Sequence, residues 1–397
     1  MAGYGLLVAF WGVFLMAFWA HMVPRLGYLT RNLPIGNDMP CKKPECDFSV
    51  FWPAGQLARA HDFVTLYSPH RFVAAVSAML IPCPNIETFF YPPTMLLPVG
   101  AISLLPFEWG AFVWTFGMVV LAVLILRLAR VHWLVILAGL LSPAALLNME
   151  VGQLGVLGGA LLVAGFTLAQ RRPGLSGGLL GLLACKPQTG ILVPIVYLAQ
   201  RNWRALIAFT LMALALVALV TWVFGVAVWD AYFTLGHAET MRVLGAPFDP
   251  HTSQGWGVSI YWLARSFGAS TGAASTGQFA VSLLAAAALY WLWQRRALFA
   301  ESFVEAAVLL SLLATPYGYS ADMVGYSLVL AEAARRRGWR INMLDTLLWL
   351  WPGFCLVVSI STGHELTPLI VMLALWRAWR VPLPGAEPVL PGAPIGA

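Results

Sequence analysis

Long apolar runs, separated by short basic clusters, are the feature that most limits how this chain can fold. The runs cover residues 3–23, 107–127, 131–148, 154–170, 175–199, 204–224, 275–294, 302–316, 320–334, 342–361 and 365–380. A helix satisfies its own backbone hydrogen bonds inside a bilayer, and about 20 apolar residues are enough to cross it. The chain is 60% hydrophobic and 10% charged, whereas soluble proteins carry about 25% charged residues. We therefore predict an all-α polytopic membrane protein.

Basic residues predict which ends of these runs are cytoplasmic. Six clusters hold 14 of the 23 Lys and Arg residues, namely Arg127/Arg130, Arg171/Arg172, Arg201/Arg204, Arg295/Arg296, Arg335/Arg336/Arg337/Arg340 and Arg377/Arg380. With every cluster in the cytoplasm, the chain makes 12 membrane segments and both termini are cytoplasmic. The prediction is a single domain over 1–381, with external loops at 24–106 and 225–273 and a disordered cytoplasmic tail at 382–397. The net charge of +6 then marks loops, and no nucleic-acid partner is expected.

Two apolar stretches do not fit as simple spans. The run 175–199 lies between two cytoplasmic clusters, so it must enter the membrane and return, turning at "CKPQTG". Its two arms are short, which predicts half-helices or tilted helices that line a cavity built of protein. The stretch 92–106 is predicted to be a membrane-surface or re-entrant piece of the first external loop, which carries interfacial helices.

Asp47 precedes an amphipathic segment, "FSVFWPAGQLARAHDF". Phe48, Phe51 and Trp52 form an apolar stripe at roughly helical spacing, which predicts a helix that lies in the membrane interface. Asp47 is then either the helix cap, a role worth about 1 kcal/mol, or a catalytic carboxylate. The two roles do not exclude each other.

Cysteines in the first external loop offer a possible covalent constraint. Cys41 and Cys46 are four residues apart around "KKPE", and a disulfide is plausible outside the cytoplasm. Cys83 could replace either partner. Zinc is a weaker alternative, because His61 and Cys83 are the only nearby candidates and the spacing matches no usual site. We expect no metal and no cofactor.

Most of the ionisable residues outside the basic clusters gather at predicted external helix ends, where charge near a membrane indicates function. Glu150 and Gln153 in "NMEVGQLG" could form a polar turn or contact a ligand. Lys186, beside Gln188, needs an anion, which could be a neighbouring carboxylate or a substrate phosphate. The other candidates are His61, His251, Tyr317, Tyr319 and Asp322. A lone histidine such as His251 is more often structural.

Several segments together resemble the polytopic glycosyltransferases of family 87, which include bacterial polyprenol-phosphate-mannose-dependent mannosyltransferases. The matching stretches are "DFSVFWPAGQLARAHDFVTLYSPHRF", "FFYPPTMLLPVGAISLLP", "VGQLGVLGGALL", "LLACKPQTGILVPIVYLAQRNWRAL" and "ATPYGYSADMVGYSLVLAEAARR". Each motif alone is weak, and their shared order and spacing carry the resemblance. The stretch "CKKPEC" has no counterpart in the family pattern.

The resemblance implies the C-type glycosyltransferase fold, a polyprenyl-phosphate sugar as donor, and a lipid or glycan acceptor outside the bacterial cytoplasmic membrane. It implies that Asp47 is the general base and favours mannose as the sugar. Lys186 is our candidate for holding the donor phosphate, with His251 and Tyr317 as helpers. Contacts to the sugar or the acceptor are assigned to six residues: His61, Glu150, Gln153, Gln188, Tyr319 and Asp322.

The chemistry agrees with these residue types. Displacement at an anomeric carbon needs a base on the acceptor hydroxyl and a stabilised leaving group. One carboxylate opposite one cation implies a single displacement with inversion. The run 92–106 would help to form a groove for the lipid tail. A lipid transporter or flippase, and a non-enzymatic assembly subunit, are the competing interpretations.

Overall fold

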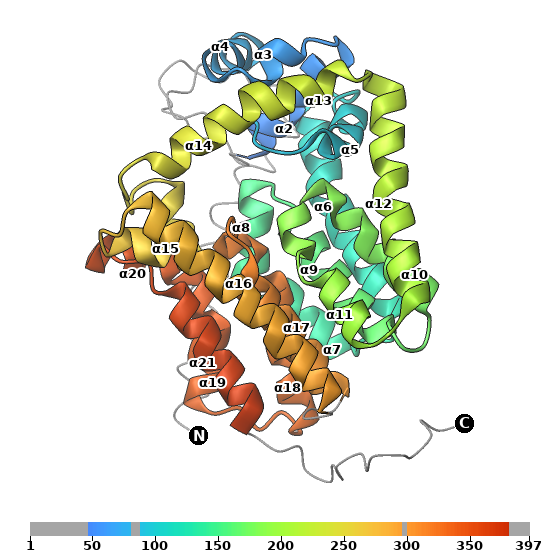
Figure 1. Cartoon of the computed structure of the whole chain (residues 1–397), viewed down its shortest axis with the longest axis vertical. Helices are drawn as coiled ribbons and strands as arrows, with labels where there is room; N and C mark the ends of the chain where they lie inside the picture. Colours follow the sequence, from blue (N-terminus) through green and yellow to red (C-terminus); the bar gives the residue numbers. More distant parts are fainter. Residues whose placement is uncertain (1–46, 81–87, 296–299, 381–397) are drawn as a thin grey trace. The chain divides into compact units, whose positions relative to one another are not determined.

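The computed structural model describes residues 47–80, 88–295 and 300–380 (Figure 1). Within these ranges the chain is helical, and the single β-bridge pairs Gly257 with Tyr319. The all-α prediction is therefore confirmed for the part of the chain that the structure describes. The chain divides into two compact units. Among the described residues, unit 1 comprises 47–80, 88–121, 146–154 and 215–246, and unit 2 comprises 122–145, 155–214, 247–295 and 300–380.

Unit 1 is built largely from short helices, several of which lie in the predicted first external loop. They are α2 (Phe48–Arg59), α3 (Phe63–Tyr67), α4 (Pro69–Met79), the 3₁₀ turn η1 (Pro93–Met95), α5 (Leu96–Ile102), α13 (Ala227–Ala231), the π-helical turn η4 (Tyr232–Gly236) and α14 (His237–Gly245). Helix α2 packs closely on α5, because a Cβ on Gly55 would lie 2.2 Å from the carbonyl oxygen of Val99. A larger residue at position 55 would force the two helices apart.

Helices α6 (Phe107–Leu128), α8 (Pro143–Val151) and α12 (Trp203–Phe224) contribute residues to both units. The α-helices of unit 2 are α7 (Trp133–Leu140), α9 (Gly155–Leu168), α10 (Pro173–Gly181), α11 (Val193–Ala199), α15 (Ile260–Ser266), α16 (Thr271–Gln294), α17 (Ala300–Ala314), α18 (Val324–Arg336), α19 (Met343–Leu350), α20 (Cys355–Thr362) and α21 (Thr367–Arg380). Its 3₁₀ turns are η2 (Leu182–Cys185), η3 (Pro187–Gly190), η5 (Ser253–Trp256), η6 (Ser320–Asp322) and η7 (Trp351–Gly353).

Three described helices, α6, α12 and α16, are long and apolar enough to cross a membrane. Two bent pairs raise this number to five if each pair is one span: α7 with α8, bent by 54°, and Met343–Gly353 with α20, bent by 78°. Shorter apolar helices follow most of the other predicted runs, and the count of 12 membrane segments stays a prediction. The run 175–199 does form two short helical arms on either side of Lys186, as predicted.

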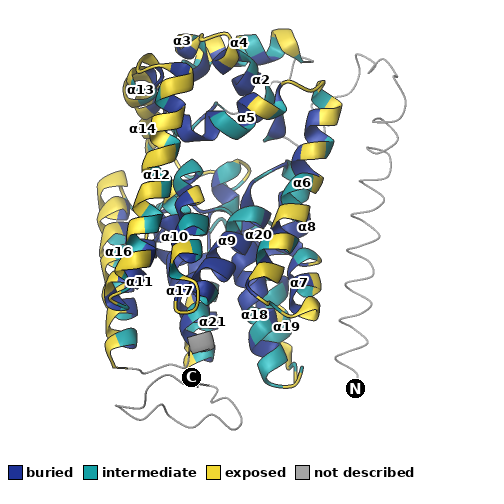
Figure 2. Ribbon diagram, turned by 90° about the vertical axis from the view of Figure 1, so that its right-hand side faces the viewer, coloured by how far each residue is buried: buried dark blue, intermediate teal, exposed yellow. Residues whose placement is uncertain are grey.

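Large apolar side chains cover the surface of the long helices. On α12, Trp222 is 82% exposed, and Leu211 and Ile207 are also exposed. On α16, Phe279 and Leu284 are exposed in the same way, while α9 is buried along most of its length (Figure 2). Exposed apolar surface on this scale is unfavourable in water and suits contact with lipid tails. This surface indicates a membrane protein.

Glycines allow a close helix crossing at the centre of unit 2. A Cβ on Gly159 of α9 would lie 2.4 Å from the backbone nitrogen of Gly325 on α18. Gly325 is similarly confined, because its own Cβ would lie 3.3 Å from the Cα of Gly159. Small residues at facing positions let two helices approach closely, which is common in membrane proteins. The crossing therefore depends most strongly on glycine at position 159.

We expect Gly159→Ala to lower the free energy of unfolding by about 1–3 kcal/mol, because the added methyl group cannot fit without moving α18. The adjacent Gly158 provides a matched control, since its Cβ would have no neighbour closer than 4.0 Å. Gly158→Ala should be neutral or slightly stabilising. Thermal unfolding of the purified proteins, followed by tryptophan fluorescence, tests both changes. Equal melting temperatures for the two variants would contradict the close crossing.

Candidate functional site

In unit 1, the Asp47 carboxylate is held by a residue distant in sequence. The Gln153 Nε2 donates a hydrogen bond to Oδ2 of Asp47 at 2.5 Å. The Asp47 backbone N–H donates to the carbonyl oxygen of Val151 at 2.9 Å. Asp47 stands at the N-cap position of α2, yet its side chain makes no capping hydrogen bond. The capping interpretation is therefore wrong for the side chain, which points its Oδ2 to Gln153 instead.

The Gln153 amide is itself held in one orientation. The Tyr91 hydroxyl donates to Oε1 of Gln153 at 2.9 Å, and the Leu154 backbone N–H lies 3.3 Å from the same oxygen. A backbone N–H can only donate, so this contact identifies the acceptor end of the amide. The NH₂ end must then face Asp47, whose Oδ2 acts as an acceptor. Tyr91, Gln153 and Asp47 form a hydrogen-bonded chain, hereafter the Asp47 cluster, that orients the carboxylate.

A turn after α8 places Gln153 for this contact. Gly152 has a φ of +75°, a conformation that glycine adopts without strain. The Trp114 Nε1 donates to the Gly152 carbonyl oxygen at 2.9 Å, which anchors the turn on α6. The motif "VGQLG" thus provides both the left-handed residue and the amide.

The aromatic stripe of α2 packs against protein. Phe48 and Phe51 are completely buried. The Phe51 ring centroid lies 5.1 Å from that of Tyr91 and 5.5 Å from that of Trp114. Trp52 is half-buried, and its Nε1 donates to the Leu105 carbonyl oxygen. The prediction that these three rings hold α2 in lipid is therefore wrong for Phe48 and Phe51, because other parts of unit 1 bury them beside the Asp47 cluster.

Two other candidate residues belong to unit 1. Glu150 lies in the last turn of α8, half-buried and three residues before Gln153. His61 is exposed, with a φ of 56°, and its ring lies edge-on to Phe63 and Phe224. These ring contacts favour a packing role for His61. Its assignment to the acceptor stays a prediction, as does that of Glu150.

In unit 2, Lys186 is paired with a carboxylate. Its Nζ lies 2.6 Å from Oδ1 of Asp322, and the two side chains are only 9% and 8% exposed. The second oxygen, Oδ2, accepts the Tyr319 backbone N–H at 3.3 Å. Of the two anions considered for Lys186, the neighbouring carboxylate is therefore present in the structure. Lys186, Tyr319 and Asp322 are hereafter the Lys186 cluster.

Three other candidate residues belong to unit 2. Gln188 is half-buried on η3, two residues after Lys186, and Tyr317 is half-buried two residues before Tyr319. His251 is exposed on a turn in which its backbone N–H donates to Oδ1 of Asp249. This hydrogen bond involves only the His251 backbone, so the role of its side chain toward a phosphate stays a prediction.

The proposed disulfide lies outside the described residues, as do Cys41, Cys46 and Cys83. The two described cysteines, Cys185 and Cys355, lie in apolar helical segments, as expected for small hydrophobic residues.

Two further polar residues were not assigned to the candidate site from the sequence. Tyr91 stands in the quoted motif "FFYPP", and its position between two prolines and two phenylalanines could have marked it as a fixed hydroxyl. Glu365 follows α20 and is completely buried. Its Oε1 accepts the backbone N–H (2.9 Å) and the hydroxyl (2.5 Å) of Thr367. Among the described residues, its Oε2 has no hydrogen-bond partner.

Burial raises the pKa of Glu365 to about 7, and the hydrogen bonds from Thr367 only partly oppose this shift. Its titratable neighbours include Cys355 on α20 and the adjacent His364, whose Nδ1 lies 3.0 Å from the Ser266 carbonyl oxygen. The folded chain thus keeps the Glu365 carboxyl group protonated at pH values at which an exposed glutamate has lost its proton.

Comparison with known families agrees with this all-helical, membrane-type architecture. The profile of glycosyltransferase family 87 matches residues 89–316, more than half of the chain. The chain belongs to glycosyltransferase family 87. The predicted family is confirmed, and membership supports a transferase over a transporter. No curated protein and no solved structure gave a significant match.

The range matched by the family model contains some of the candidate site residues but not all of them. It includes Tyr91, Gln153 and Lys186, and it ends one residue before Tyr317. Asp47 lies before it and Asp322 after it. The family match therefore supports the class of reaction, while the roles of Asp47 and Asp322 rest on their own geometry.

We expect the free energy of unfolding to fall as the pH rises from about 4.5 to about 7, because the pKa of Glu365 is higher in the folded chain than in the unfolded chain. Over this range the unfolded chain has released the proton that the folded chain retains, so a higher pH favours unfolding. Glu365→Gln should remove up to about 3 kcal/mol of this dependence and melt higher than the original protein at pH 8. Melting temperatures between pH 5 and 8 test this prediction.

Glu108→Gln is the control for this experiment, because Glu108 is an exposed carboxylate in the first turn of α6. It should leave the pH profile unchanged. A Glu365→Gln profile parallel to that of the original protein would mean that Glu365 does not cause the pH dependence.

Proposed function

We propose that this glycosyltransferase moves a hexose, with mannose as the favoured sugar, from a polyprenyl-phosphate donor to a lipid or glycan acceptor. The reaction would take place on the outer side of a bacterial cytoplasmic membrane. Asp47 acts as the general base, and the sugar is transferred in one displacement with inversion. The observation that carries the proposal is the hydrogen bond from Gln153 to Asp47, together with the family match.

The Asp47 cluster has the form that a general base requires. A base must be held so that its oxygen meets the acceptor hydroxyl, and a third group commonly orients it. Gln153 fixes the plane of the carboxylate through one oxygen, and Tyr91 in turn fixes Gln153. Orientation set before substrate arrives lowers the entropic part of the barrier.

The proposed displacement balances as follows. The acceptor oxygen forms a bond to the anomeric carbon while the bond from that carbon to the phosphate oxygen breaks. The bonding electron pair leaves with the polyprenyl phosphate, and the hydroxyl proton passes to the Asp47 carboxylate. Carboxylates are weak bases, so the proton moves late, as positive charge builds on the acceptor oxygen.

Lys186 is proposed to stabilise the charge that develops on the donor phosphate. A fixed cation does this most effectively where water is excluded, and the Lys186 side chain is only 9% exposed. Asp322 holds the ammonium group in position and also reduces its net charge. A phosphate would therefore share Lys186 with Asp322, which predicts a moderate contribution from Lys186.

We expect Asp47→Asn to reduce sugar transfer by about 10²–10⁴-fold, the usual contribution of a general base. The melting temperature should hold, because the Asn amide oxygen can still accept the Gln153 N–H. The assay follows radiolabelled polyprenyl-phosphate mannose into a membrane lipid extract. Gln153→Ala should give a smaller loss, seen mainly in kcat, because the base remains but is less well oriented. Full turnover by a folded Asp47→Asn variant would falsify the base assignment.

The Lys186 and Asp322 pair is tested by single and double substitutions. Lys186→Gln or Asp322→Asn alone should destabilise the protein by about 3–5 kcal/mol, because each removes one partner of a buried ion pair. The double variant should regain most of that stability. If Lys186 holds the donor phosphate, the double variant should transfer sugar more slowly than the original protein even though its stability is restored. Recovery of both stability and activity would show that the pair is structural only.

A further inference from the structure

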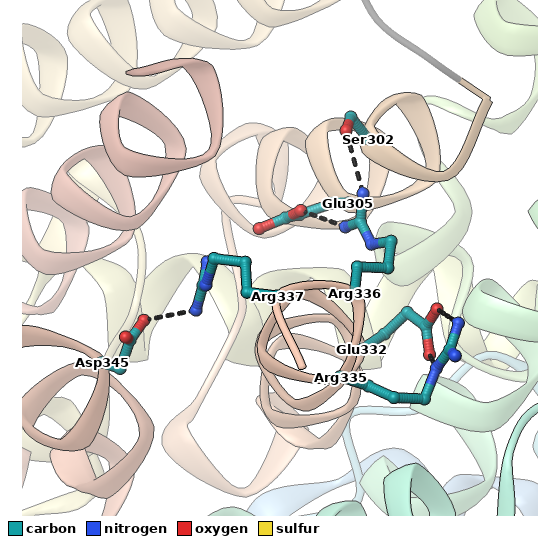
Figure 3. A network of polar contacts seen from close by, with 7 residues as sticks. All are labelled: Ser302, Glu305, Glu332, Arg335, Arg336, Arg337 and Asp345. Atoms are coloured by element: carbon teal, nitrogen blue, oxygen red, sulfur yellow. Dashed lines mark hydrogen bonds and ion pairs between the residues drawn. The ribbon is translucent and has the colours of Figure 1, made fainter. Parts of the chain in front are cut away.

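A second group of buried charges lies in unit 2, at the opposite end of α18 from Asp322. Asp322 precedes this helix and Arg336 ends it, so about 20 Å of helix separates the two ends. The group joins four helices: Glu305 on α17, Arg336 and Arg337 at the end of α18, Asp345 on α19 and Arg377 on α21. We call these five residues the arginine cluster (Figure 3 shows four of them).

Each arginine of the cluster has one anionic partner. Arg336 donates to Oε2 of Glu305 at 2.7 Å and to the Ser302 hydroxyl at 3.0 Å. Arg337 donates to Oδ1 of Asp345 at 2.8 Å, and Arg377 pairs with the same oxygen. The other oxygen of Asp345 accepts the Asn342 backbone N–H. One carboxylate therefore serves two guanidinium groups.

The cluster carries more positive than negative charge. It holds three arginines and two carboxylates, with side-chain exposures between 6% and 12%. The nearby pair of Glu332 and Arg335 is more exposed and neutralises itself, and Arg340 is exposed. A buried charge without a counter-charge costs several kcal/mol. Among the described residues, the cluster therefore lacks one negative charge.

Unused hydrogen-bond donors accompany this excess charge. The Nε atoms of Arg336, Arg337 and Arg377 are all buried without a hydrogen-bond partner in the described part of the chain. Burial lowers the pKa of Arg337, Asp345 opposes this shift, and the guanidinium group of Arg377 adds to it. Three buried donors and a repulsion between guanidinium groups both favour an additional anion.

We propose that the arginine cluster binds a phosphate group, supplied either by an anionic lipid headgroup or by inorganic phosphate. Arginine is the residue best suited to this ligand, because its planar fork matches phosphate oxygens. The topology predicted from the basic clusters places Arg335–Arg337 and Arg377 on the cytoplasmic side. Basic pockets between membrane helices on that side bind anionic headgroups. The proposal is independent of the transferase reaction.

The experiment compares the stabilisation of the purified full chain by two phosphate sources. One arm titrates inorganic phosphate against sodium chloride at equal ionic strength. The other arm compares nanodiscs of phosphatidylcholine with nanodiscs that also contain phosphatidylglycerol. We expect a saturable rise in melting temperature in at least one arm, and the responding arm identifies the source. A chain that responds to neither arm would overturn the proposal.

Substitutions distinguish a ligand site from a purely structural network. Arg377→Gln leaves two arginines and two carboxylates, so the cluster becomes neutral. We expect it to fold and to weaken phosphate binding about 10-fold or more. Asp345→Asn and Glu305→Gln increase the excess charge and should enlarge the response to phosphate. If Arg377→Gln does not fold, Arg337→Gln makes the same change of charge on the other side of Asp345.

Arg340→Gln is the matched control, since it removes one exposed positive charge outside the cluster. It should retain the full response to phosphate. An equal phosphate response in Arg377→Gln and the original protein would place the anion elsewhere and reject this site.

Discussion

The requirement that buried polar groups have partners governs where this apolar chain can carry chemistry. Its helices satisfy their own backbones, so the side chains decide which positions are costly. In each unit, a polar residue of the candidate site meets a partner from a distant segment. Gln153 reaches Asp47 across 106 residues, and Lys186 reaches Asp322 across 136. These contacts hold the candidate functional groups in fixed orientations.

The course of the helices could largely be predicted from the sequence, because hydrophobic runs report directly on burial or lipid contact. Helices α6, α12 and α16 follow three predicted runs, and the two arms around Lys186 follow a fourth. A hydrophobic pattern does not show whether an apolar side chain contacts lipid or the interior of the protein. Phe48 and Phe51 form an apolar stripe in either setting, so their burial inside unit 1 could not be predicted from spacing alone.

The sequence identifies the residues of the candidate site by their type, but it does not show which of them form hydrogen bonds or ion pairs with each other. Asp47, Gln153, Lys186 and Asp322 stand out because polar residues are rare in this chain. Which of them pair depends on contacts between segments more than 100 residues apart, and one sequence does not contain that information. The cap position shows the same limit. Local sequence favours a cap at Asp47, whereas the turn at Gly152 brings a competing amide to its carboxylate.

The two positively charged groups of unit 2, Lys186 and the arginine cluster, differ in their balance of charge. Lys186 and Asp322 form a neutral pair, so a phosphate that approaches Lys186 competes with a carboxylate already in place. Under the proposed function, Asp322 would weaken phosphate binding at Lys186, which suits a leaving group that must depart after each turnover. The arginine cluster carries an excess positive charge and three unused Nε donors, so an added anion completes the network without displacing a partner. The anion that we propose for this cluster would therefore act as a resident ligand and not as a substrate.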